Sequence, residues 1–182
     1  MKNGITFIIP TINRGTLGRS IESLLNQTNP NWFAIVVFDG IEKYDFEDDR
    51  IISLKVDKIG ESGKSGLVRN YGIKMACTEW IGFLDDDDTL TNDYVEKLFM
   101  QYSDKDLVVW KMIYTNGVVL PPENHKTLDY ANVGISFCFK NKFENLFFDG
   151  NSLIEDLEFL KKLESLTDNW VISNDICYKI RH

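Results

Sequence analysis

Apolar and polar positions follow one another along the first hundred residues in blocks that predict strands and helices in turn. Continuous apolar runs, typical of strands buried on both faces, occupy Ile5 to Ile9, Phe33 to Phe38 and residues 80–84, while Ile51 to Val56 alternates. Between these runs, apolar residues recur at helical spacing. The three helical sets are Leu17, Ile21, Leu24 and Leu25; Leu67, Val68, Tyr71 and Met75; and Tyr94, Val95, Leu98, Phe99 and Tyr102.

Polar residues before the second and third helical sets predict where those helices begin. Ser65 and Thr91 are the expected N-caps, because a hydroxyl at that position accepts a hydrogen bond from a free backbone N–H. Strands that alternate with amphipathic helices are typical of an α/β protein with a mostly parallel sheet covered on both faces.

The pattern changes after about residue 102. Leu107 to Tyr114, Val118 to Leu120 and Val133 to Phe139 are strand-like, with no clear helix between them. One late helix is indicated by Leu153, Leu157, Leu160 and Leu163, and short strands are expected over 170–180, with a loop at 121–127. We expect one domain over 1–182, made of a Rossmann-like half (about 1–102) and a mixed half (about 103–182).

Composition and charge exclude several classes of protein. The net charge of −8 and pI near 4.8 argue against a nucleic-acid partner, since phosphate backbones require a basic surface. No apolar run approaches the roughly 20 residues that span a bilayer, and no signal-peptide pattern opens the chain. The three cysteines, Cys77, Cys138 and Cys177, are odd in number and widely spaced. We therefore expect free thiols and a cytoplasmic location.

An acidic run directly after the apolar strand at 80–84 is the main chemical signal. Asp85, Asp86, Asp87 and Asp88 follow one another, and the run itself contains no lysine or arginine. Adjacent carboxylates raise one another's pKa values, and a divalent cation such as Mg²⁺ or Mn²⁺ relieves that repulsion. A solvated acidic loop is the alternative. The strand before the run favours a site, because ligands of open α/β sheets bind beyond the carboxyl ends of strands.

Six segments in chain order resemble the motifs of family 2 glycosyltransferases, which have the GT-A fold. They are Phe7-Ile-Ile-Pro-Thr-Ile-Asn-Arg14, Ser23-Leu-Leu-Asn-Gln-Thr28, Ile35-Val-Val-Phe-Asp-Gly40, Val68-Arg-Asn-Tyr-Gly-Ile73, Ile81 to Asp88 (the DXD motif) and Ile154-Glu-Asp-Leu-Glu-Phe159. Each segment alone is a weak signal, whereas six in order at sensible spacing form a strong one. The resemblance implies a nucleotide-sugar-binding half followed by an acceptor-side half.

The same resemblance implies a function. A family 2 enzyme is a metal-dependent, inverting glycosyltransferase that moves a sugar from a UDP-, GDP- or dTDP-sugar to a hydroxyl of a glycan or lipid-linked acceptor. Mg²⁺ and Mn²⁺ are the expected cofactors. Peripheral membrane association or a homodimer is compatible with this class.

Residues after the first two strands are implied to bind the nucleotide. Pro10, Thr11 and Arg14 resemble residues that line the base and ribose pocket, and Asp39 resembles the acid that accepts a nucleobase N–H. Phe38 departs from the family, where an acid is common, but Asp39 keeps the better-matched position. The alternatives are a strand-ending proline, a surface arginine and a simple Asp-Gly turn.

The remaining nucleotide-side roles fall on Arg69 and the acidic run. Arg69 is expected to reach a nucleobase or a diphosphate oxygen, with a solvated helix arginine as the alternative. By resemblance, Asp85 and Asp86 meet ribose hydroxyls and metal-bound water, while Asp87 ligates the metal. Asp88 and Thr89 are expected only to cap the following turn.

The acceptor-side motif supplies the expected catalytic acids. Asp156 is the candidate general base, which an inverting displacement needs to take the proton of the acceptor hydroxyl, and Glu155 accompanies it. The alternative is that both acids merely favour the first turn of a helix. By resemblance, His182 is a candidate further metal ligand.

Two other functions remain open from sequence. Phe83 to Leu90 also fits the D-x-D-x-T pattern of haloacid-dehalogenase-like phosphatases, with Asp85 as nucleophile and Asp87 as acid. That assignment leaves the matches at Pro10, Asp39 and Arg69 unexplained. The other alternative is a nucleotide-sugar-binding module without turnover.

Overall fold

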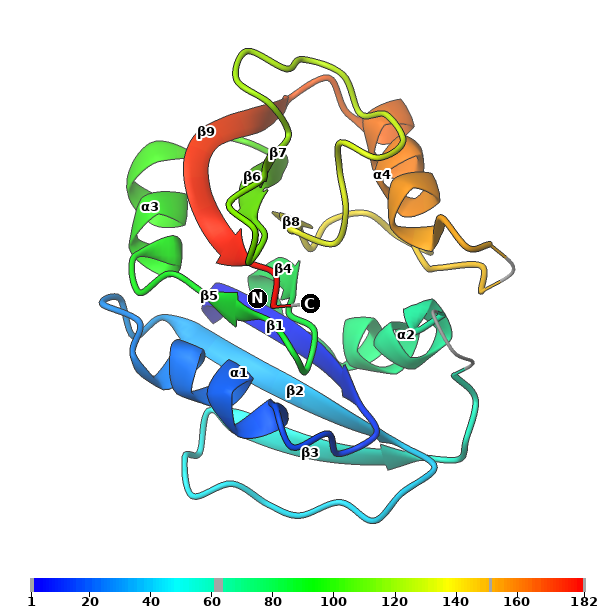
Figure 1. The fold of residues 1–182 in the computed structure, drawn as a ribbon. Helices are drawn as coiled ribbons and strands as arrows, with labels where there is room; N and C mark the ends of the chain where they lie inside the picture. The colour runs from blue at the N-terminus through cyan, green and yellow to red at the C-terminus, as the bar shows by residue number, and fades with distance from the viewer. Residues whose placement is uncertain (1, 61–63, 151, 182) are drawn as a thin grey trace.

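The computed structural model describes residues 2–60, 64–150 and 152–181, and within these residues nine strands form one sheet (Figure 1). The strands are β1 (Lys2–Thr11), β2 (Trp32–Asp39), β3 (Ile51–Val56), β4 (Thr78–Phe83), β5 (Thr89–Leu90), β6 (Leu107–Ile113), β7 (Val119–Leu120), β8 (Phe137–Lys140) and β9 (Trp170–Lys179). Their order across the sheet is β3-β2-β1-β4-β8-β6-β9-β5, and β7 pairs with β6.

The sheet is parallel in its first half and mixed in its second. β1 pairs in parallel with both β2 and β4, and β3 continues that arrangement beyond β2. β8 is antiparallel to β4 and β6, whereas β6 and β9 are parallel. The strand order reverses at β1 and β4, and this reversal opens a crevice at their carboxyl ends.

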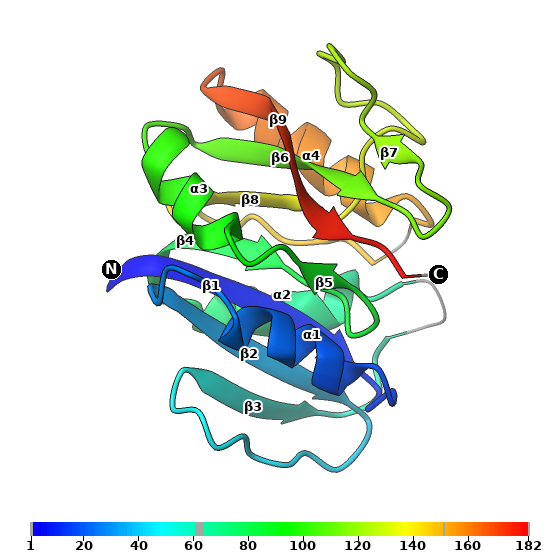
Figure 2. The same cartoon turned by 60° about the vertical axis from the view of Figure 1, so that its left-hand side comes forward.

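The helices cover both faces of the sheet, as the alternating pattern predicts. Within the described residues they are α1 (Leu17–Leu25), α2 (Gly66–Met75), α3 (Tyr94–Gln101) and α4 (Glu155–Leu166). α1 and α3 lie on one face, and α2 and α4 lie on the other (Figures 1 and 2). A β-strand points alternate side chains to opposite faces, so each strand contributes to two apolar layers.

Aromatic side chains fill both layers. On the α4 side, the centroid of the Phe159 ring lies 4.2 Å from that of the Phe148 ring and 5.9 Å from that of the Phe83 ring. On the α3 side, the Tyr94 ring lies 5.2 Å from Phe7 and 4.8 Å from Trp110. Each such buried ring contributes about 1.5–3 kcal/mol. These contacts join the second half of the chain to the parallel strands.

A glycine determines how closely α2 packs on the sheet. A Cβ atom at Gly72 would lie 2.5 Å from Cγ2 of Ile8 in β1, which is closer than any real contact of this kind. Gly72 therefore allows the α2 backbone to approach β1. Arg69 lies one turn earlier on the same helix.

The structure corrects several predicted elements of the second half. β8 begins at Phe137 rather than at Val133, and a turn over residues 129–132, in which Ala131 has a φ of 66°, precedes this segment. Residues 170–179 form one strand with register shifts against β6, rather than several short strands. The short β5, which pairs with β9, was not expected. The predicted loop at 121–127 contains neither helix nor strand.

Of the two predicted helix caps, Thr91 is wrong, and Ser65 is right in position but not in its hydrogen bond. α3 begins at Tyr94, after Asp93, and the Thr91 hydroxyl donates to the Asp93 carboxylate rather than capping the helix. Ser65 does precede α2, but its side chain makes no capping hydrogen bond. The backbone N–H groups at that end find a partner on a distant helix instead, as described below.

Candidate active site

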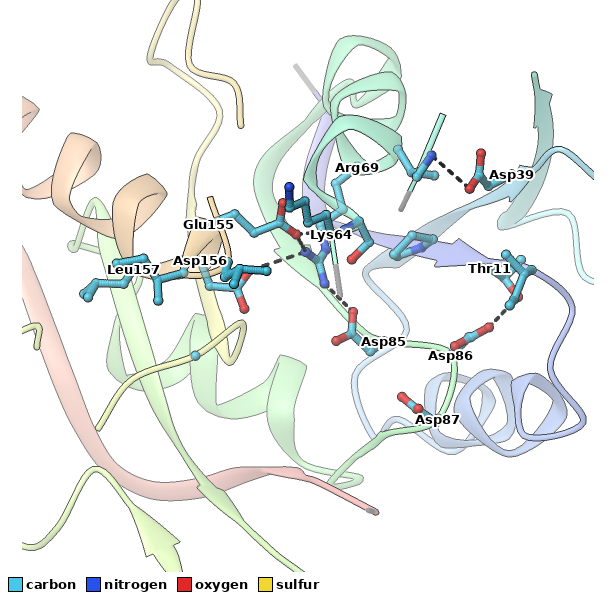
Figure 3. A pocket seen from close by; sticks show the side chains of 18 of the residues that line it. Thr11, Asp39, Lys64, Arg69, Asp85, Asp86, Asp87, Glu155, Asp156 and Leu157 are labelled. Atoms are coloured by element: carbon cyan, nitrogen blue, oxygen red, sulfur yellow. Dashed lines mark hydrogen bonds and ion pairs between the residues drawn. The ribbon is translucent and has the colours of Figure 1, made fainter. Parts of the chain in front are cut away.

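A cavity of about 840 Å³ opens where the carboxyl ends of the parallel strands face the start of α4 (Figure 3). Both halves of the chain line it. The first half contributes Pro10, Thr11, Arg14, Asp39, Lys58, Arg69, Asp85, Asp86 and Asp87, and the second contributes Tyr130, Val133, Leu153, Ile154, Glu155, Asp156 and Leu157. All the predicted site residues that the structure describes therefore lie around one cavity.

Thr11 and Asp86 connect the end of β1 with the acidic run. The Thr11 hydroxyl donates to Oδ2 of Asp86 at 2.6 Å, and the Asn13 N–H donates to the same hydroxyl at 2.8 Å. Burial raises the pKa of Asp86, although the Thr11 hydrogen bond and Arg14 oppose that rise. The side chains that follow β1 and β4 are thus in direct contact.

The acidic run obtains positive charge from two arginines that lie elsewhere in the sequence. Nη1 of Arg14 lies 2.5 Å from Oδ2 of Asp87 and 3.3 Å from Oδ1 of Asp86. Nη2 of Arg69 lies 2.5 Å from Oδ1 of Asp85. The run itself contains no cation, and the fold brings these two arginines to it.

Asp39 is the last residue of β2 and lies buried against the cavity. Its carboxylate accepts the backbone N–H groups of Ile59 at 2.8 Å and Gly60 at 3.1 Å, and it also binds the Lys58 ammonium. Burial raises the pKa of Asp39, but these three donors outweigh it and the pKa lies below its ordinary value. Gly40 has a φ of 72°, so the Asp-Gly turn is present as well.

Arg69 joins the two sides of the cavity. Only 2% of its side chain is exposed, and its Nη1 lies 3.1 Å from Oε1 of Glu155 and 3.3 Å from Oδ1 of Asp156. Burial lowers the pKa of Arg69, but the three carboxylates, Asp85 included, outweigh it and raise the pKa above its ordinary value. The alternative of a solvated helix arginine is wrong. Figure 3 shows the guanidinium between Asp85 and the two acids of α4.

Glu155 completes the start of α2, a helix 90 residues earlier in the chain. Its Oε1 accepts the N–H groups of Ser65 and Gly66, both at 2.8 Å. A carboxylate at a helix N-terminus is stabilised by the free N–H groups and the helix dipole. Glu155 is itself buried, and its other oxygen, Oε2, has no hydrogen-bond partner among the described residues.

Asp156 is the second residue of α4 and, unlike the adjacent Glu155, is partly exposed. About 30% of its side chain is exposed, and Arg69 is its ion-pair partner. Burial raises the pKa of Asp156 to about 6; Arg69 opposes the rise, while Asp85 and Glu155 add to it. A carboxyl with this pKa is ionised near neutral pH and is a better proton acceptor than an ordinary aspartate. The alternative of a plain first-turn acid explains its place on α4 but not its contact with Arg69.

The end of β9 and the residues after it also contact the acidic run, and no local pattern predicted these contacts. The Tyr178 hydroxyl accepts the Asp85 N–H at 3.0 Å, and the Arg181 N–H donates to Oδ1 of Asp88 at 3.1 Å. Asp88 is buried, and burial, reinforced by Asp85, raises its pKa to about 7. Asp88 therefore contacts the end of β9 as well as its own turn, and Thr89 lies in β5 rather than in a cap.

The metal site that the resemblance implies falls on the acidic run. Within 2–60, 64–150 and 152–181, no three His, Cys, Asp or Glu side chains converge into a ready-made metal-binding group. Asp85, Asp86 and Asp87 line the cavity, and each already has an arginine or hydroxyl partner. His182 lies outside the described residues.

Comparison with solved structures identifies the class of fold. The chain superimposes over its whole length on the crystal structure of Staphylococcus aureus TarS 1-349, with a TM-score of 0.78 and 20% sequence identity, covering 60% of that chain. A TarS 1-349 structure in complex with UDP-GlcNAc gives a TM-score of 0.76 at the same identity. The fold is therefore α/β of the GT-A type.

Sequence comparison then gives the family. A model described as glycosyl transferase family 2 matches residues 6–154, and the chain belongs to that family. It is 30% identical over 117 residues to the poly(ribitol-phosphate) beta-N-acetylglucosaminyltransferase TarP of S. aureus and 29% identical over 115 residues to the glycosyltransferase GlyG of Streptococcus pneumoniae. These matches cover 59% and 58% of this chain. They cover only 36% and 37% of those relatives, so the chain spans little more than a third of their length.

Among the described residues, no helix has both the length and the apolar character that crossing a membrane requires. The three cysteines are free, as expected: Cys138 and Cys177 are buried and Cys77 is exposed.

Proposed function

We propose that this chain transfers a sugar from a nucleotide-diphosphate sugar to an acceptor hydroxyl, with metal assistance and with inversion at the anomeric carbon. The acceptor in this proposal is a glycan or a lipid-linked molecule. Family membership and the arrangement of the cavity support it together.

The nucleotide occupies the side of the cavity formed by the parallel strands. Asp39 has three donors on its two oxygens, and a carboxylate offers about four acceptor positions, so it retains capacity for a nucleobase N–H. Thr11 and Pro10 lie beside it, and the acidic run lies at the end of β4, where the ribose and the diphosphate are expected.

The donor set suits Mg²⁺ or Mn²⁺ in type. Carboxylate oxygens are the ligands that such hard cations prefer, and Mg²⁺ is commonly held by one or two carboxylates together with substrate phosphates rather than by a complete protein cage. Asp87, with 26% of its side chain exposed, would hold the ion, with Asp85 and Asp86 beside it. A bound cation would neutralise charge on the departing nucleoside diphosphate.

Asp156 is the proposed general base. It lies across the cavity from the nucleotide side and has the raised pKa that suits a base near neutral pH. In a single displacement, its carboxylate takes the acceptor proton as the acceptor oxygen attacks, and the opposite face of the sugar loses the nucleotide. The adjacent acid, Glu155, accepts three hydrogen bonds through one oxygen and acts in this proposal as a positioning residue.

One observation carries the proposal: a single cavity joins the nucleotide-side residues to Asp156 through the buried Arg69. Isothermal titration with UDP, GDP and dTDP, with and without Mn²⁺, tests the binding half. We expect at least one nucleotide to bind and Mn²⁺ to strengthen that binding. If none binds at any Mn²⁺ concentration, the proposal is wrong.

Asp156→Asn tests the catalytic half. Because the amide cannot accept the acceptor proton, we expect transfer to fall about 10²–10⁴-fold while nucleotide affinity stays within twofold. Full transfer activity in the variant would remove Asp156 as the base. A wild type that binds nucleotide but transfers to no acceptor and hydrolyses no donor would instead favour the binding-module alternative.

The phosphatase alternative has its own test. It requires Asp85 as a free nucleophile, whereas Asp85 is held by Arg69 at 2.5 Å. Hydrolysis of an aryl phosphate by the wild type, lost in Asp85→Asn, would support the phosphatase. We expect no such activity.

A further inference from the structure

We infer that Arg14 is an exchangeable counter-ion of the acidic run: it neutralises Asp87 until a divalent cation binds there, and it then binds the diphosphate of the nucleotide. This inference rests on the proposed function, because it assigns a regulatory role to a residue of the same site. According to this inference, the Arg14 side chain lowers the affinity for the metal and raises the affinity for the nucleotide.

The geometry of Arg14 places one guanidinium nitrogen against two carboxylates. Nη1 lies 2.5 Å from Oδ2 of Asp87 and 3.3 Å from Oδ1 of Asp86. A divalent cation on Asp87 would then face a guanidinium within contact distance of its own ligand. Because like charges at such distances repel strongly, the cation and the Arg14 head group compete for Asp87.

The two arginines of the site differ in their freedom to move. Arg69 is 2% exposed and contacts three carboxylates, so displacing it would leave all three without their cation. Arg14 is 51% exposed and contacts one buried and one accessible carboxylate. Exposed ion pairs are weak, so Arg14 is released at little cost and Arg69 is not.

The backbone around Arg14 is fixed although its side chain is not. The Arg14 carbonyl accepts the Leu17 N–H at 3.1 Å, where α1 begins, and Asn13 holds a φ of 61° with its N–H on the Thr11 hydroxyl. Exchange therefore needs only side-chain rotation. The side chain already lines the cavity, so a diphosphate bound there lies within its reach.

A guanidinium is well suited to bind the diphosphate once Asp87 is released. Its planar fork matches two phosphate oxygens at once, and charge-assisted hydrogen bonds of this kind are stronger than neutral ones. When the Asp87 carboxylate coordinates the cation, the diphosphate replaces Asp87 as the ion-pair partner of Arg14. Metal binding and nucleotide binding thereby become linked through Arg14.

The test measures Mn²⁺ and UDP separately in the full chain, by isothermal titration. In Arg14→Ala we expect Mn²⁺ without nucleotide to bind about three- to tenfold more tightly, because the competing charge is gone. At saturating Mn²⁺ we expect UDP to bind about tenfold more weakly, because a charge-assisted contact is lost. Arg14→Lys keeps the charge without the fork and should leave Mn²⁺ affinity near wild type while UDP affinity stays reduced.

Arg19→Ala is the matched control. Arg19 is exposed on α1 and absent from the cavity lining, so the variant removes the same charge from the same part of the chain. We expect both of its affinities to stay within twofold of wild type. Thermal melting checks that the variants are folded.

The outcomes separate this inference from the proposed function. If wild type binds UDP with Mn²⁺ but Arg14→Ala matches Arg19→Ala in both affinities, the inference is wrong and the proposed function stands. Weaker Mn²⁺ binding in Arg14→Ala would also overturn it, because Arg14 would then support the metal. If wild type binds no nucleoside diphosphate at all, the proposed function itself fails.

Discussion

The two sides of the cavity obtain their functional residues in different ways. On the nucleotide side, Thr11, Asp39 and the acidic run each stand at or just after the end of a parallel strand, so the sheet itself brings them together. On the acceptor side, residues 141–150 and 152–154 before α4 contain neither helix nor strand, and Glu155 and Asp156 at the start of α4 are located by contacts with α2. The first side depends on the sheet, and the second depends on Arg69.

This difference predicts unequal responses to substitution. Removing one side chain on the nucleotide side should cause a local loss, because the strands remain in place. Removing Arg69 should disturb both sides, because its guanidinium contacts Asp85 as well as the acids of α4.

The largest effect is expected from Arg69→Leu. The substitution leaves the buried Glu155 and the partly exposed Asp85 and Asp156 without their cation, and breaking a buried ion pair typically costs about 3–5 kcal/mol in the free energy of unfolding. Urea denaturation followed by circular dichroism measures it. The control, Arg19→Leu, changes an exposed arginine and should stay within about 0.5 kcal/mol of wild type. Equal stability of the two variants would contradict the claim that the acceptor side of the cavity depends on Arg69.

The pH dependence of transfer should report on Asp156 itself. Burial raises the pKa of Asp156 to about 6, and a general base acts only when deprotonated. Activity should therefore be level above about pH 7 and fall by about tenfold for each pH unit below 6. The measurement is kcat/KM from pH 4.5 to 8.5 (about the range in which most proteins stay folded). A profile with no inflection between pH 5 and 7 (about one unit either side of that pKa) would argue against Asp156 as the titrating base.

The smallest effect is expected from Thr11→Val on the nucleotide side. Valine keeps the shape of the side chain but cannot donate a hydrogen bond to Asp86. The loss of one such hydrogen bond lowers the free energy of unfolding by about 1.5–3 kcal/mol at most, and by less where water replaces it. We expect a lower UDP affinity with the activity of bound donor largely retained, as titration and single-turnover transfer would show. A loss as large as that of Arg69→Leu would contradict the independence of the strand-end residues.

Local patterns predicted the parallel half well. The helix expected over 17–25 and the strand over 51–56 have those bounds, because buried strands and amphipathic helices carry their periodicity within a few residues. The second half was predicted less well. Its short strands are defined by pairing partners such as β9 with β6 and β5, which no local pattern encodes.

For the candidate site too, local patterns did not predict which residues contact one another. The motifs identified which residues surround the cavity, but not how they bind one another. The contact between Arg14 and Asp87 joins positions 73 residues apart, and that between Arg69 and Glu155 joins positions 86 apart. Glu155 was expected to accompany Asp156 as a catalytic acid, with a first-turn acid of its own helix as the alternative, and neither expectation included its contact with the start of α2. Such pairings follow from the tertiary fold, so the residue types alone did not reveal them.

The close packing of α2 on β1 has a consequence for chemistry at the far side of the cavity. Arg69 precedes Gly72 by three positions, so the height of this helix above Ile8 determines how far the guanidinium extends toward α4. A methyl group at position 72 would lift the helix and withdraw the arginine from the acids that it holds. The alignment of the proposed base is therefore governed in part by a residue that possesses no functional group.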